Sequence, residues 1–68
     1  MNNAIQRLVF DHKADLPDSD QIELKRLIDT DQMYEMEIRR CEQQKQKAET
    51  QQFQVWMDII RLFQKHNI

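Results

Sequence analysis

Two histidines, one cysteine and a short acidic run are the residues of this sequence that could carry out chemistry. His12 and His66 lie near opposite ends of the chain with Cys41 between them, so no short-range spacing of zinc ligands is present. Catalysis by Cys41 would require a neighbouring base and an oxyanion pocket. Its position in a seven-residue repeat, described below, favours a packed and inert thiol instead. We therefore expect no catalytic activity.

The acidic run Asp18-Ser19-Asp20 begins like a calcium-binding loop. Such a loop needs glycine at its sixth position and glutamate at its twelfth, but these positions hold Glu23 and Asp29. The chain contains no glycine at all, which also excludes a glycine-rich phosphate loop. The sequence therefore predicts neither a metal ion nor another cofactor.

The size of the chain limits how it can be stabilised. Its 68 residues form at most one domain, and so small a core is marginal unless a disulfide, a metal ion or a second subunit supports it. One cysteine cannot build a disulfide framework, so we expect a second protein chain, either another copy in a homodimer or a heterologous helix. The lone cysteine and the lack of a secretory leader favour a cytoplasmic protein. No apolar stretch approaches the ~20 residues of a membrane span.

The composition predicts an all-α fold, because sheet proteins of this size need several turn residues and this chain has no glycine and one proline. Asn2 or Asn3 can cap a short amphipathic helix over residues 3–13. A loop is expected over residues 14–18, where Pro17 disfavours helical geometry in the residue before it.

A second, long helix is expected over residues 19–66. Asp20 and Glu23 have the spacing of a capping box at its start, and no glycine or proline stops it before the C-terminus. A continuous helix would measure roughly 70 Å. The alternative is a bend or a fold-back into a hairpin at residues 29–31 or 49–51.

Uncharged residues recur at every seventh position of the predicted long helix, as in one core column of a coiled coil. The column three residues earlier is half polar, because it contains Asp31, Lys45 and Gln52. Two interpretations follow: a true coiled-coil seam, or a solvated helix held at its ends by packing elsewhere. The heptad column consists of Leu27, Tyr34, Cys41, Ala48, Val55 and Leu62.

Charge is distributed unevenly along the chain. Residues 1–38 carry four Lys or Arg against nine Asp or Glu, a net charge of −5, whereas residues 39–68 carry six against three, a net charge of +3. Parallel chains would place like charges side by side. The asymmetry therefore favours antiparallel, coiled-coil-like pairing, between two chains or within one.

Apolar residues between positions 53 and 63 cover almost the whole circumference of a helix. Such a helix must be buried from more than one side, for example by the N-terminal helix and by a second chain. Trp and Met are enriched at binding hot spots. We therefore expect partner binding or self-association through Phe53, Trp56, Met57, Ile59, Ile60 and Phe63.

A basic stretch offers an alternative function, that of a small dimeric regulator that binds nucleic acid. Acidic residues interrupt this stretch and the net charge of the chain is −2, so nucleic acid is the less favoured partner. The residues concerned are Arg39, Arg40, Lys45 and Lys47.

The segment Gln52-Phe53-Gln54-Val55-Trp56 resembles the small helical co-chaperones of type III secretion needle subunits, and the likeness covers these five residues. The resemblance implies a protein that shields an aggregation-prone helix of a secretion-system subunit. From the residues themselves we expect a helical protein–protein interaction module, of adaptor, chaperone or inhibitor type, that acts through helix packing.

Overall fold

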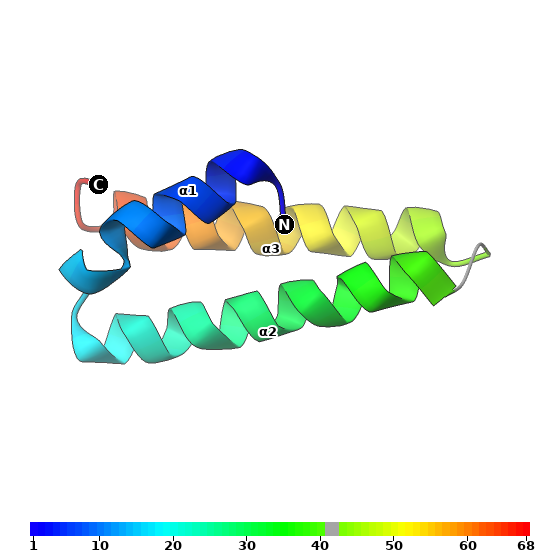
Figure 1. Cartoon of the computed structure of the whole chain (residues 1–68), viewed down its shortest axis with the longest axis horizontal. Helices are drawn as coiled ribbons and strands as arrows, with labels where there is room; N and C mark the ends of the chain where they lie inside the picture. The colour runs from blue at the N-terminus through cyan, green and yellow to red at the C-terminus, as the bar shows by residue number, and fades with distance from the viewer. Residues whose placement is uncertain (41–42) are drawn as a thin grey trace.

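Three α-helices and one 3-10 turn form the computed structural model, which describes residues 1–40 and 43–68. They are α1 (Asn3–His12), η1 (Lys13–Asp15), α2 (Asp18–Arg40) and α3 (Lys45–Gln64). α2 and α3 form an antiparallel hairpin, and α1 packs against the C-terminal half of α3 (Figure 1). The predicted all-α class is confirmed.

The alternative of a fold-back into a hairpin is confirmed and the continuous helix expected over residues 19–66 is wrong, because the chain reverses between Arg40 and Lys45. Neither alternative reversal point, at residues 29–31 or 49–51, is used, and the molecule is only 39 Å long. Gln44 precedes α3 without a side-chain capping bond, so no local signal marks where this helix begins. Folding back is favoured because it lets the apolar sides of α2 and α3 cover each other.

The heptad column lies in the seam of this hairpin. Leu27, Ala48 and Val55 are buried there, while Tyr34 and Leu62 are partly buried. The sixth member of the column, Cys41, lies outside the described residues. The antiparallel pairing that the charge pattern favoured thus occurs within one chain.

The N-terminal helix begins as the sequence predicts. The side chain of Asn2 accepts a hydrogen bond from the backbone N–H of Ile5 at 2.9 Å, which satisfies one of the free donors of the first turn. Ile5 is buried and belongs to the same apolar core as Leu16, Ile59 and Phe63. This core fixes α1 against α3.

The expected capping box at the start of α2 does not form. α2 begins at Asp18, so Asp20 already lies in its first turn and its carboxylate contacts Lys65 and His66. Glu23 accepts hydrogen bonds from Arg26 instead.

Among the described residues, no helix is both long enough and apolar enough to span a membrane.

Candidate functional site

The apolar segment predicted to bind a partner is divided between the core and the surface. Ile59 and Phe63 are fully buried in the core of the chain, so in this fold they are not accessible to another protein. Phe53 is 58% exposed. Trp56, Met57 and Ile60 are partly buried. The structure therefore does not present this segment as one continuous surface.

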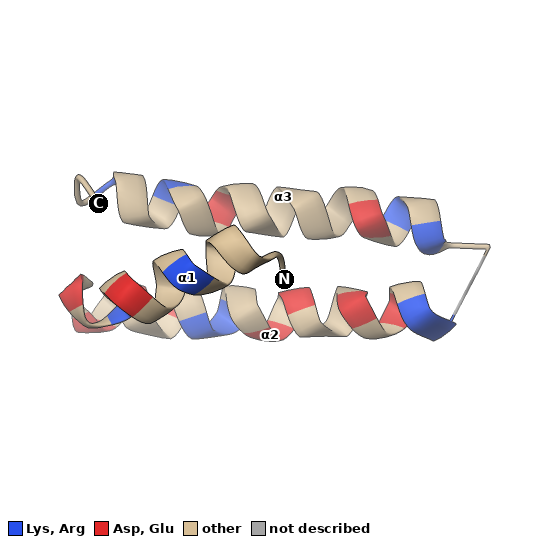
Figure 2. Ribbon diagram, turned by 45° about the horizontal axis from the view of Figure 1, so that its top comes forward, with Lys and Arg blue, Asp and Glu red and all other residues tan. Residues whose placement is uncertain are grey.

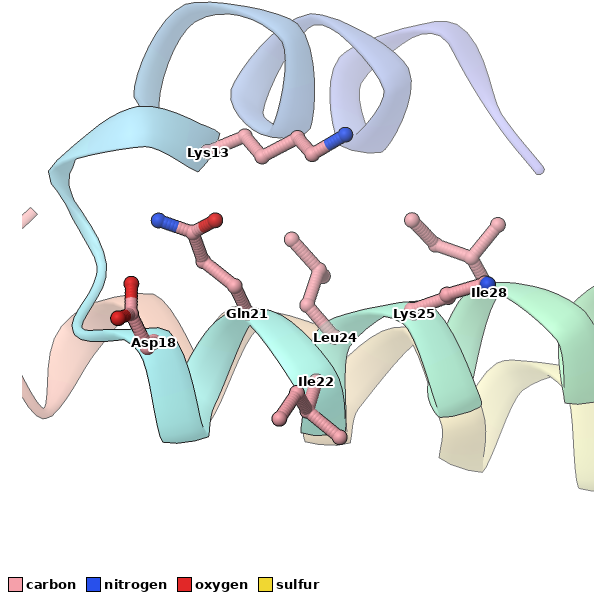
Figure 3. Close-up of a pocket in the computed structure, with 7 residues that line it drawn as sticks. All are labelled: Lys13, Asp18, Gln21, Ile22, Leu24, Lys25 and Ile28. Carbon is pink, nitrogen blue, oxygen red and sulfur yellow. The ribbon is translucent and has the colours of Figure 1, made fainter.

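A groove that the sequence did not predict lies between η1 and α2 (Figure 3). It exists because α1 packs against α3 and leaves the neighbouring side of α2 without a helix over it. Its volume is about 550 Å³. We call it the α1–α2 groove, and it is lined by Lys13, Asp18, Gln21, Ile22, Leu24, Lys25 and Ile28.

The floor of the α1–α2 groove is apolar. Leu24 and Ile28 rise from α2 toward α1, and Lys13 extends beneath α1 above them (Figure 3). Leu24 also belongs to the core and is buried, whereas Ile28 is partly buried. Gln21 is held in place because its side-chain Nε2 donates a hydrogen bond to the carbonyl oxygen of Leu16 at 2.8 Å. Concave, mostly apolar surfaces with a few polar groups are typical of binding sites.

The rim of the groove carries exposed apolar and basic side chains. Ile22 points away from α1 and is 72% exposed. Lys13 and Lys25 stand on opposite walls. The only sequence signal for this site is a pair of isoleucines on α2, Ile22 and Ile28. They lie outside the heptad column and outside the column three residues before it.

A buried polar cluster joins α2 to α3 beside the apolar core. Asp31 is 1% exposed and accepts hydrogen bonds from Trp56 Nε1 at 2.6 Å and Gln52 Nε2 at 3.2 Å. It also lies 3.4 Å from the N-terminal ammonium group of Met1. Gln52 donates to Glu35 as well, at 2.7 Å, and this bond holds the pKa of Glu35 below its usual value.

The arrangement of this cluster is structural. Among the described residues, every fully buried side-chain nitrogen or oxygen has a hydrogen-bond partner, as packed polar groups require. Asp31 and Gln52 are the buried polar members of the column that lies three residues before the heptad column. They form a hydrogen bond with each other across the hairpin. The indole N–H of Trp56 is used within the chain.

A second polar contact joins the C-terminal region to the start of α2. His66 donates a hydrogen bond from Nε2 to Asp20, and Lys65 Nζ lies 3.6 Å from the same carboxylate. The hydrogen bond from His66 is the main cause that lowers the pKa of Asp20. This contact fixes the end of the chain without forming a cleft.

The four basic residues proposed for nucleic-acid binding come together at the tip of the hairpin. Arg39 and Arg40 end α2, and Lys45 and Lys47 lie in the first turn of α3 (Figure 2). Arg39 is 3.7 Å from Glu35, which neutralises part of this charge.

The α1–α2 groove is therefore a concave, accessible and mostly apolar feature of the part of the chain that the structure describes. No cluster of metal-ligating side chains occurs in the same residues. No protein-family model, curated protein or solved structure matches this chain.

Proposed function

We propose that this protein is a cytoplasmic helical interaction module that docks an apolar helix of a partner protein in the α1–α2 groove. The observation that carries the proposal is the groove itself, with about 550 Å³ of space over an apolar floor. A helix in this position would pack on α2 beneath α1 and would add a fourth helix to the bundle. It would complete the burial of Ile28, which is only partly buried in the chain alone.

The lining of the groove suggests the chemistry of its partner. Its α2 wall runs from Asp18 to Ile28, a length of about 15 Å, or roughly three turns of a partner helix. Lys13 and Lys25 favour acidic residues on both flanks of the partner's apolar face. An adaptor, an inhibitor or a chaperone that shields a secretion-system helix would each use such a surface.

Quantitative affinity capture from the source cell, with the tagged chain as bait, tests the proposal. Two variants impair the groove in opposite ways: Ile28→Gln makes the floor polar, and Lys13→Trp fills the space. Both should lose the bound partner while retaining helical circular dichroism. Gln54→Trp on the exposed side of α3 is the matched control. A partner retained equally by the wild-type chain and all three variants would contradict the proposal.

Nucleic-acid binding is a second candidate, supported by the convergence of Arg39, Arg40, Lys45 and Lys47 at one end of the hairpin. Fluorescence anisotropy with a labelled duplex tests it. Binding that weakens steeply with salt, and is lost in Arg40→Glu/Lys47→Glu, would support this function. A chain that fails to bind the duplex at low salt would exclude duplex binding at the tip.

A further inference from the structure

The side of α2 that faces away from α3 carries an unusual share of the exposed apolar side chains. Among the described residues, five large apolar side chains are more than half exposed. Three of them lie on α2: Ile22 at 72%, and Met33 and Met36 at 51% each. Met33 and Met36 follow Ile22 by about three and four helical turns, so all three share one face. No helix of the described chain covers α2 on this side (Figure 1).

Three exposed charged residues lie on or beside this face between Ile22 and the methionines; Arg26 is paired with Glu23 within α2, and the other two are Lys25 and Asp29. Lys25 is three residues after Ile22, and Asp29 is four residues before Met33. We define the α2 outer face as Ile22, Lys25, Asp29, Met33 and Met36. Its order along the helix is therefore apolar, positive, negative, apolar.

This order is complementary to itself only when read in the opposite direction. Two antiparallel copies of α2 would place Ile22 of each copy beside Met33 of the other, and Lys25 of each beside Asp29 of the other. Parallel copies would place Lys25 against Lys25 and Asp29 against Asp29, which is repulsive. A surface that matches its own copy in this way forms a closed, two-fold symmetric contact.

We propose that two copies of this chain associate through the α2 outer face in antiparallel orientation. The unbranched methionine side chains can adjust to fill the contact between the two helices. A contact along one helix face buries less than the roughly 1,200 Å² of a typical stable interface. The dimer is therefore weak, and we expect it to form at chain concentrations of about 10–500 µM.

The α2 outer face shares Ile22 and Lys25 with the rim of the α1–α2 groove, but it does not include the groove floor. The dimer therefore does not depend on the function proposed above. Ile28→Gln separates the two, because it alters the floor and leaves all five residues of the outer face in place. This variant should dimerise as the wild type does, whether or not it loses a partner from the groove.

Analytical ultracentrifugation of charge-reversal variants tests this dimer. The wild-type chain should form a dimer as its concentration rises through the range given above. Lys25→Glu would place two carboxylates together, and Asp29→Lys would place two ammonium groups together. Each variant alone should therefore dimerise about tenfold more weakly or not at all. A mixture of the two variants should form a heterodimer, because both charge pairs are then attractive.

Two controls keep the result specific. Circular dichroism verifies that both variants fold, and Lys47→Glu with Glu49→Lys provides a matched charge exchange on α3. A wild-type chain that remains monomeric throughout would overturn the proposal. So would a dimer that survives each single variant, or variants that do not associate when mixed. A contact of the α2 outer face with a different protein, without self-association, would also overturn it.

Discussion

Asp31 is a buried charged residue, so the groups around it determine whether it stabilises the fold. A buried carboxylate without partners would be strongly destabilising. The indole of Trp56, the amide of Gln52 and the ammonium group of Met1 all lie within bonding distance of it. These groups belong to α3 and to the start of the chain, and Asp31 therefore links α2, α3 and the N-terminus.

Trp56→Phe should separate the hydrogen bond to Asp31 from the packing of the ring. It keeps most of the ring volume but removes the N–H, and should lower the free energy of unfolding by about 1–3 kcal/mol. Trp56→Ala also removes the packing and should cost about 3–5 kcal/mol. Urea denaturation measures both. If the bond to Asp31 is responsible, Trp56→Phe should have a smaller effect in an Asp31→Ala background, which has no acceptor for the indole N–H. An equal effect in both backgrounds would contradict this account.

Asp20 should make the stability of the fold sensitive to acid. Its pKa is lowered in the folded chain, chiefly by the hydrogen bond from His66, relative to the usual value of 3.8. The stabilisation is therefore present above about pH 4 and is lost as the pH falls through the lower folded pKa. Asp20→Asn should flatten the fall in melting temperature between about pH 5 and pH 2.

His66→Ala should flatten the same acid profile, because it removes the group that donates to Asp20. Asp11→Asn on the exposed surface of α1 controls for the loss of one negative charge. A profile for Asp20→Asn as steep as that of the wild type would contradict a stabilising role for this contact.

At the scale of helices, the sequence predicts those features that depend on local chemistry. The all-α class follows from the lack of glycine, the start of α1 from the cap at Asn2, and the buried column from the seven-residue repeat. The reversal after Arg40 could not be predicted, because Gln44 supplies no capping bond and the region has neither glycine nor proline. It depends on packing between α2 and α3, which a sequence pattern does not specify.

α3 should respond very differently to substitutions on its two sides. Ile59 is fully buried in the core that α3 shares with α1 and α2, so Ile59→Ala should lower the free energy of unfolding by about 2–5 kcal/mol. Phe53 is 58% exposed, and Phe53→Ala should change the free energy of unfolding by only about 0.5 kcal/mol. Chemical denaturation of the two variants measures the difference. Equal effects would mean that the segment between residues 53 and 63 is buried from all sides, as the sequence alone suggested.

At the scale of the whole molecule, the groove is a product of tertiary packing. The sequence contains its isoleucines, but nothing in their spacing says that α1 will pack on α3 rather than on α2. Only that choice leaves space between Lys13 and the side chains of Leu24 and Ile28 (Figure 3). The hairpin thus has a basic tip at one end and an apolar groove at the other, and the groove is the surface that we expect to hold a partner.

Site-specific photo-crosslinking in the source cell tests this expectation most directly. A benzophenone amino acid at the exposed position Lys13 reaches over the α1–α2 groove, and the same amino acid at Gln54 samples the exposed side of α3. The account predicts an adduct with a heterologous protein at position 13 and little or none at position 54. No adduct at position 13, equal yields at both positions, or an adduct only with a second copy of this chain would contradict it.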